Sequence, residues 1–221
     1  MFGWGEMTSG ALTRDYWGLG TEPEVAGQPG TALSGIMAGT RVASTQGWRA
    51  IEAISAGDKV LTFDSGLQRV TEVERAPLWG DAQSCPVALW PLEVPPGALG
   101  NRDRMFLTPD QAVLIESDTA EAMLGDPFAL LPARVLDGVR GMCRVPPPAG
   151  VEVVTLRFAA EQIVFANSGA MFLCTASGDL VGQAGDNRNV MPVYPVLSED
   201  TARMLADALI QSGRVPSSSK R

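Results

Sequence analysis

The chain has no histidine among its 221 residues. Histidine is the commonest general base in enzymes and the commonest protein ligand of transition metals. Its absence excludes serine–histidine and cysteine–histidine hydrolase schemes built within this chain alone. It also disfavours an unrelated small-molecule enzyme on a β scaffold. We therefore predict no metal site and no cofactor.

Cysteine and basic residues are also scarce. The three cysteines, Cys85, Cys143 and Cys174, lie far apart in the sequence and form no C-x-x-C pair, which indicates neither a disulfide framework nor a zinc site. Lys and Arg number 17 against 25 Asp and Glu, giving a formal net charge of −8. A field of that sign repels phosphate backbones, so nucleic acid is not an expected partner of this acidic protein.

Long apolar runs are missing as well. No segment approaches the roughly 18–20 continuous apolar residues of a transmembrane helix. Residues 1–17 lack the basic start and apolar run of a Sec signal peptide. We predict a protein without a membrane span that is cytoplasmic by default, and export by a route without such a signal stays open.

From residue 39 to about 178, short β-branched runs alternate with Gly, Pro, Asp and Asn, which is typical of an all-β fold. Within the segment 59–64, side-chain alternation predicts that Val60, Thr62 and Asp64 face one way and that Leu61 and Phe63 face the other. Strands are expected at 40–45, 59–64, 68–76, 105–115, 151–158 and 161–169.

Helix signals are few. Short helices are expected at 117–125 and 132–138, because each has a capping residue or a proline near its start and ends on glycine. A longer amphipathic helix is expected at 198–213, with Ser198 as N-cap and Gly213 as the stop. We predict that its apolar stripe is a packing face rather than a partner-binding face. The stripe consists of Ala202, Leu205, Ala206 and Leu209.

The ends of the chain differ in composition from its middle. We predict a flexible N-terminal arm at 1–33, a β domain at 34–178, a linker at 179–197 and a disordered tail at 214–221. The arm carries Trp4, Tyr16 and Trp17. Aromatic residues in a loose arm dock either on a partner or on the domain's own surface, and both alternatives stay open.

The densest pattern is the stretch from Ser34 to Asp64, SGIMAGTRVASTQGWRAIEAISAGDKVLTFD. Gly57-Asp58 before an apolar run indicates a turn that enters a buried strand. The stretch resembles the entry motif of Hedgehog/intein (Hint) domains, and most closely that of bacterial stand-alone Hint-domain proteins. The positions in register with that motif are Gly39, Thr40, Val42, Gly47, Ile51, Glu52, Ile54, Gly57, Asp58, Val60, Leu61, Thr62 and Asp64.

Two later segments extend the resemblance to about residues 35–175. LTPDQAVLI at 107–115 resembles the family's second block, and IVFANSGAMFL at 163–173 resembles its late hairpin. Asn167 and Gly169 suit left-handed turn positions in that hairpin. The resemblance implies a mainly β, horseshoe-like Hint fold with short helices and a C-terminal helix.

The resemblance also implies a chemistry. Active members use a Cys or Ser to attack the preceding carbonyl, and a Thr and a His at T-x-x-H spacing assist the tetrahedral intermediate. Here the nucleophile position is Gly35, Thr108 keeps the threonine, and Gln111 replaces the histidine. Glutamine donates a hydrogen bond but cannot deliver a proton near pH 7.

Two neighbouring side chains are further candidates. Ser34 carries a hydroxyl, but an offset of one residue moves it by ~3.3 Å along an extended strand. That is large against the ~0.5 Å tolerance of a preorganised site. Cys174 falls near the family's late His-Asn pair, and we interpret it as a small buried hydrophobe.

Two functions remain as hypotheses. The first is a Hint-type domain that has lost autoproteolytic and splicing chemistry and acts as a structural or binding module, so that no enzymatic activity is expected. The alternative is a divergent self-cleaving domain that uses Ser34 and Thr108, with Gln111 and either Asp103 or Asp110 assisting. A protein partner would bind the N-terminal arm or the C-terminal helix, and the oligomeric state is left open.

Overall fold

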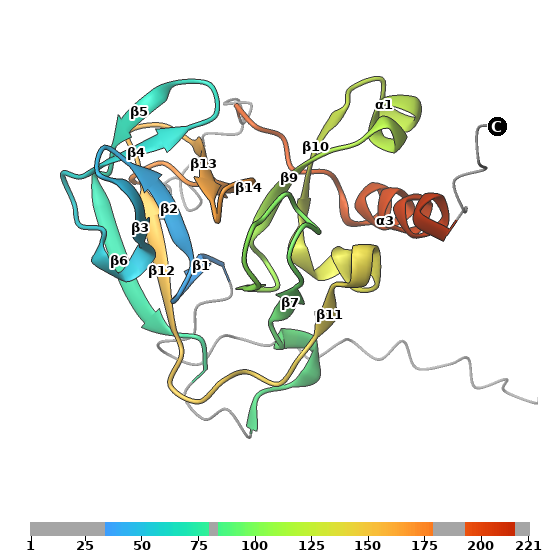
Figure 1. The fold of residues 1–221 in the computed structure, drawn as a ribbon, viewed down its shortest axis with the longest axis horizontal. Coiled ribbons are helices and arrows are strands. Elements are labelled where there is room, and N and C mark those ends of the chain that lie inside the picture. The colour runs from blue at the N-terminus through green and yellow to red at the C-terminus, as the bar shows by residue number, and fades with distance from the viewer. Residues whose placement is uncertain (1–33, 80–83, 179–192, 215–221) are drawn as a thin grey trace, which may run out of the picture.

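In the computed structural model, residues 34–79, 84–178 and 193–214 are described, and their strands form two antiparallel sheets (Figure 1). Within these residues the first sheet has six strands in the order β11-β7-β8-β1-β12-β6. They are β1 (Ile36–Met37), β6 (Glu72–Pro77), β7 (Leu92–Val94), β8 (Met105–Leu107), β11 (Cys143–Arg144) and β12 (Glu152–Arg157).

In the described part of the chain the second sheet has eight strands, in the order β10-β9-β14-β13-β2-β4-β5 with β3 paired to β2. They are β2 (Arg41–Ser44), β3 (Gly47–Ala50), β4 (Lys59–Thr62), β5 (Gly66–Arg69), β9 (Ala112–Glu116), β10 (Phe128–Pro132), β13 (Gln162–Ala166) and β14 (Ala170–Cys174). The mainly β fold expected from the sequence is therefore confirmed.

The helices lie at the edges of the sheets. α1 (Asp118–Leu124) begins after Ser117, whose hydroxyl accepts a hydrogen bond from the Thr119 amide, and ends at Gly125 in a left-handed conformation, as its capping pattern predicts. α3 (Glu199–Arg214) lies on the side of the molecule opposite β2 and β3 (Figure 1). Short 3-10 turns are η1 (Ile51–Ala53), η3 (Val87–Leu89), η4 (Ala133–Leu136) and η5 (Val139–Gly141).

The apolar stripe of α3 is part of the core. Ala202, Leu205, Ala206 and Leu209 are buried, and the helix contacts α1, β10, η4 and η5. The expectation of a packing face is thus confirmed. Among the described residues, no helix is long and apolar enough to cross a membrane.

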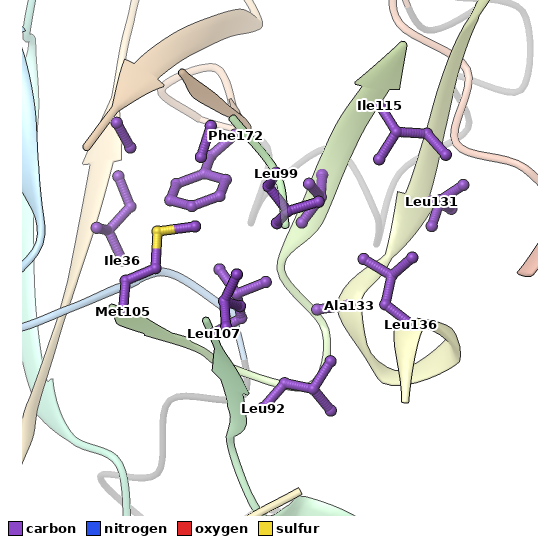
Figure 2. Packing of buried hydrophobic residues seen from close by; sticks show 14 of the residues in the cluster. Ile36, Leu92, Leu99, Met105, Leu107, Ile115, Leu131, Ala133, Leu136 and Phe172 are labelled. Carbon is purple, nitrogen blue, oxygen red and sulfur yellow. The ribbon is translucent and has the colours of Figure 1, made fainter. Parts of the chain in front are cut away.

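One core joins the two sheets. Figure 2 shows Ile36 and Met105 of the first sheet beside Phe172 of the second, with Leu131 and Leu136 farther along the same cluster. Val60 and Thr62 point inward and are buried, whereas Leu61 and Phe63 are exposed, which confirms the alternation expected there. Asp64 lies beyond the end of β4 and is exposed.

Two strand predictions were wrong in the same way. The segment 105–115 is divided into β8 and β9, which belong to different sheets. Pro109 lacks an N–H for a ladder, and the chain turns between the Thr108 carbonyl and the Gln111 amide, which form a hydrogen bond. The segment 68–76 is likewise divided into β5 and β6 at residues 70–71.

Other predictions fall on parts of the chain that are not described or differ in detail. The predicted helix 132–138 is the 3-10 turn η4, and Gly138 after it has a φ of +87°. The predicted arm at 1–33, residues 179–192 of the predicted linker and residues 215–221 of the predicted tail lie outside the described residues.

Candidate functional site

Gly35 directly precedes β1, which lies between β8 and β12 in the first sheet. Ile36 pairs with Leu107 of β8 on one side and with Val154 of β12 on the other. This register places Gly35 between Thr108 and Thr155. Thr108 is fully buried, and its hydroxyl donates a hydrogen bond of 3.0 Å to the Gly35 carbonyl oxygen.

The backbone of Gly35 has no place for a side chain. Its φ is +131°, a conformation that residues with a β-carbon rarely adopt. A β-carbon built there would lie 2.7 Å from Cγ1 of Val153 and 2.9 Å from Oγ1 of Thr155. Both neighbours are β-branched and stiff in a strand. The space that a nucleophile's side chain would need is therefore occupied by β12.

Gln111 is committed to the backbone. Its side chain is buried, and its Nε2 donates hydrogen bonds of 2.9 Å each to the carbonyl oxygens of Ala112 and Leu173. β9 and β14 pair through Leu114–Met171 and Val113–Phe172, so Leu173 is the next residue along this ladder. The Gln111 amide thus continues the contact between β9 and β14 after the strand pairing ends.

A small cavity lies beside these residues, and Ser34, Gly35, Gln111 and Cys174 contribute to its lining. It measures about 20 Å³. One water needs roughly 10–15 Å³ of such space, so the cavity accommodates about one water molecule. A peptide segment could enter it only if β1 or β12 moved.

Cys174 ends β14 and is buried. Burial in an apolar environment raises the pKa of its thiol to about 12, because the charged thiolate loses its hydration there. The thiol is therefore protonated at neutral pH and is a poor nucleophile. This geometry agrees with its interpretation as a small hydrophobe.

The groups that could assist Ser34 lie elsewhere. Ser34 is exposed at the rim of the cavity, but neither Asp103 nor Asp110 lines it. The Asp110 carboxylate pairs with the guanidinium of Arg134, which also binds Glu199 at 2.6 Å. The cavity therefore brings Ser34 together with Gly35 and Gln111, and it leaves both acids out.

The motif side chains of the entry stretch act on the backbone. A Glu52 carboxylate oxygen accepts a hydrogen bond of 2.7 Å from the Gly39 amide. An Asp58 carboxylate oxygen accepts one of 3.0 Å from the Ser55 amide and one of 2.9 Å from Arg49. The backbone hydrogen bond from Ser55 lowers the pKa of Asp58; desolvation opposes this effect, and the Arg49 guanidinium adds to it.

Two further glycines and one threonine of the motif lie in or beside turns. Gly47 and Gly57 have φ values of +85° and +97°, which a glycine adopts without steric cost. Thr40 is buried, and its carbonyl accepts a hydrogen bond from the Ile51 amide. These groups build the turns that lead into β2, β3 and β4.

Asp64 anchors a segment that comes from the far end of the chain. The Tyr194 hydroxyl donates a hydrogen bond of 2.6 Å to the Asp64 carboxylate. Burial, followed by the hydrogen bond to Asp64, raises the pKa of Tyr194 to about 12. The Glu161 carboxylate accepts from the amides of Val193 and Tyr194. Residues 193–197 are thus held against the domain.

The late hairpin confirms one turn expectation and corrects another. Asn167 has a φ of +43°, and its Oδ1 accepts a hydrogen bond of 2.8 Å from the Arg41 amide. The second left-handed residue is Ser168, with a φ of +78°, and not Gly169. Gly169 serves a different need, since a β-carbon there would lie 2.2 Å from the Gly100 carbonyl oxygen.

Sequence reasoning did not identify Val153, Thr155 or Leu173 as part of the site. Val153 and Thr155 fill the space beside Gly35, and Leu173 supplies a carbonyl to Gln111. Val153 and Thr155 lie in an ordinary β-branched run, and a backbone carbonyl leaves no trace in the sequence. Only the pairing of distant strands reveals their roles.

The sequence model of the Hint domain family matches residues 35–171. The chain is similar to the bacterial intein-like domain from Clostridium thermocellum, with 17% identity, coverage of 64% of this chain and 99% of that chain, and a TM-score of 0.45. It is also similar to the gp41-1 intein, with 15% identity, 64% and 98% coverage and a TM-score of 0.37.

A third similar structure is a splice-inactive variant of the AceL NrdHF class 3 split intein, with 14% identity, coverage of 65% of this chain and 98% of that chain, and a TM-score of 0.38. No curated protein matches the chain.

Proposed function

This chain belongs to the Hint domain family, and on that premise we propose that it has lost autoproteolytic and splicing chemistry and serves as a structural or binding module. The observation that carries the proposal is the absence of room for a β-carbon at Gly35. An acyl shift needs a side chain that attacks the preceding carbonyl, and β12 occupies the place of that side chain.

The other two chemical positions support the same conclusion. The Thr108 hydroxyl is used by the Gly35 carbonyl, and both amide protons of Gln111 are used by backbone oxygens. Neither group is available to stabilise an oxyanion or to protonate a leaving amide nitrogen. Each of them instead stabilises the junction of strands where an active site would lie.

The test is the integrity of the full chain. Purified protein is incubated for days with and without hydroxylamine, and its intact mass is followed by mass spectrometry. We expect a single species of 23.3 kDa throughout. A fragment that begins at Ser34 and is absent in Ser34→Ala would overturn the proposal in favour of self-cleavage through Ser34.

A rescue experiment tests the steric argument separately. The double variant Gly35→Cys/Gln111→His restores the family's side chains, and circular dichroism establishes whether it folds. We expect the folded variant to stay intact, because the new β-carbon meets Val153 and Thr155. Cleavage by this variant would show that only the side chains, and not the backbone, had been lost.

A further inference from the structure

The outer face of the second sheet is apolar where β3, β2, β4 and β5 lie side by side. Trp48 pairs with Ala43, and Leu61 pairs with Leu67. Because Val42 and Val60 point into the core, alternation places these two pairs on the opposite face. Trp48, Leu61 and Leu67 remain 41%, 38% and 45% exposed.

Aromatic rings continue this surface past the end of β4. Phe63 lies 5.5 Å from Phe128 and 6.2 Å from Phe165, measured between ring centroids. Phe63 and Phe128 are themselves exposed. Contiguous exposed apolar surface of this kind marks an interaction site more often than scattered single residues do. We call this surface the outer face; it consists of Trp48, Leu61, Phe63, Leu67, Phe128 and Phe165.

Positive charges border the outer face. Arg41 lies two residues before Ala43 in β2, and Lys59 lies two residues before Leu61 in β4. Arg69 is the partner of Lys59 across the β4–β5 pair. Because residues two apart in a strand share a face, all three cations lie on the same side of the sheet as the apolar row. Among the described residues none of the three makes an ion pair. β2, β3, β4 and β5 contain no acidic residue, although the whole chain has a net charge of −8.

Residues 1–33 have the complementary composition. They contain four acidic residues, Glu6, Asp15, Glu22 and Glu24, against the single arginine Arg14. They also contain the aromatic residues Phe2, Trp4, Tyr16 and Trp17. An acidic segment with aromatic anchors suits a surface of exposed aromatic rings bordered by unpaired cations.

The connection between the two is long enough. Residue 17 is separated from Ser34 by 17 positions, which span up to about 55 Å when extended. A domain of this size has a radius of gyration of roughly 15 Å, so every face lies within reach. Covalent attachment gives the segment an effective concentration on the order of millimolar, which favours it over a partner in dilute solution.

We propose that residues 1–33 dock in cis on the outer face, with aromatic side chains against Trp48, Leu61 and Leu67 and carboxylates beside Arg41, Lys59 and Arg69. This interaction does not depend on whether the domain retains any chemistry. It makes the outer face a binding site whose first occupant is the chain itself, and displacement of that occupant would expose the site to another acidic, aromatic segment.

The chain offers a selective chemical test, because its only lysines are Lys59 and Lys220. A water-soluble carbodiimide activates a carboxylate, which then forms an amide bond with a lysine amine while the carbodiimide is converted to a urea. The full chain is treated at low micromolar concentration, the monomer band is digested, and peptides are identified by mass spectrometry. We expect Lys59 to be joined to carboxylates within residues 1–33.

Three variants decide whether the cross-link reports docking. Leu67→Asp and Trp17→Ala should each reduce the Lys59 cross-link several-fold, because they remove an apolar contact from one side. Met204→Asp, which places the same charge at an exposed apolar residue of α3, should leave it unchanged. Circular dichroism confirms that each variant is folded.

The opposite results are equally clear. Absence of cross-links between Lys59 and residues 1–33, or cross-links that persist in Leu67→Asp, would overturn docking in cis. Cross-links confined to a dimer band would assign the outer face to a second copy of the chain. Binding of the unmodified chain to anionic lipid vesicles, abolished in Leu67→Asp, would assign it to a membrane surface instead.

Discussion

The region around Gly35 and the outer face of the second sheet use polar groups in opposite ways. Around Gly35, Thr108 and Gln111 are buried, and their side chains donate hydrogen bonds to backbone carbonyls. On the outer face, Arg41, Lys59 and Arg69 have no acidic partner among the described residues, and large apolar side chains stay exposed. The polar side chains around Gly35 are buried and hydrogen-bonded within the protein, whereas the outer face exposes apolar side chains beside cations that have no ion-pair partner among the described residues.

The two regions therefore suit different roles, one in holding the strands together and the other in binding. Buried hydrogen bonds that are fully made hold strands together and leave nothing for a substrate. A contiguous exposed apolar surface is a marker of an interaction site. Under the proposed function the residues around Gly35 are part of the framework, and under the docking proposal the outer face is the surface for recognition.

The largest effect is expected for Gly35→Ala. Backbone strain costs about 1–3 kcal/mol and overpacking costs about 1–3 kcal/mol, so the free energy of unfolding should fall by about 2–6 kcal/mol. Gly39→Ala is the matched control, since Gly39 has a φ of +87° but no neighbour within 4 Å of a built β-carbon. Urea titration measures both variants. Equal losses would contradict the steric role of β12.

Gln111→Leu should rank second. The variant leaves the Ala112 and Leu173 carbonyls without the donor they now have, and an unsatisfied buried group costs about 1–3 kcal/mol. We expect a loss of about 2 kcal/mol by urea titration. Gln68→Leu, whose amide donates to the Ser65 carbonyl at an exposed turn, should change the value by less than about 0.5 kcal/mol. An unchanged free energy of unfolding in Gln111→Leu would mean that the two hydrogen bonds of Gln111 do not stabilise the junction of β9 and β14.

A smaller effect is expected at the start of α3, where Glu199 pairs with Arg134 of η4. Hydrogen bonds from Arg134, and then from Arg203, lower the pKa of Glu199 from 4.5 to about 2. A depressed folded-state pKa stabilises the protein above 4.5, and this contribution is lost as the pH falls toward 2. The partly exposed pair is screened by solvent, so the effect should be at most about 1 kcal/mol.

Thermal unfolding between pH 2 and pH 7 measures this dependence. Glu199→Gln should unfold at a lower temperature than the natural chain at pH 7, and the two should converge near pH 2. Glu116→Gln is the control, because the Glu116 carboxylate makes no ion pair within the described residues. A constant difference across the range would exclude the ion pair as its cause.

The smallest effect on stability is expected on the outer face. Leu67→Ser removes an exposed side chain of an edge strand, and such substitutions usually change the free energy of unfolding by no more than about 0.5 kcal/mol. The same variant should nevertheless weaken the Lys59 cross-link to residues 1–33. A fall of several kcal/mol in the free energy of unfolding would show that Leu67 belongs to the core. The outer face would then be part of the framework, like the region around Gly35.

The entry stretch shows how far sequence reasoning reaches. Gly57 and Asp58 form the expected turn, and Val60 and Thr62 point inward as their alternation predicts. Ser117 and Gly125 bound α1 as expected. These features depend on neighbouring residues, whose conformational preferences act over a few bonds.

The same reasoning was wrong where distant strands decide. The segment 105–115 looks like one apolar run, yet β8 pairs with β1 in one sheet and β9 pairs with β14 in the other. Gly169 was assigned a left-handed backbone, but its role is the close approach of Gly100. Both errors concern contacts between residues that lie far apart in the sequence.

The amino-acid sequence by itself determined the family and the mainly β fold, and it places Gly35 and Gln111 where the resemblance expects a nucleophile and a histidine. It determined them because motif spacing and alternation are local properties. Only the tertiary structure decided that β12 fills the space beside Gly35 and that Gln111 joins β9 to β14. Those contacts arise from chain segments that meet only after folding, so steric exclusion and hydrogen-bond satisfaction can be established from coordinates alone.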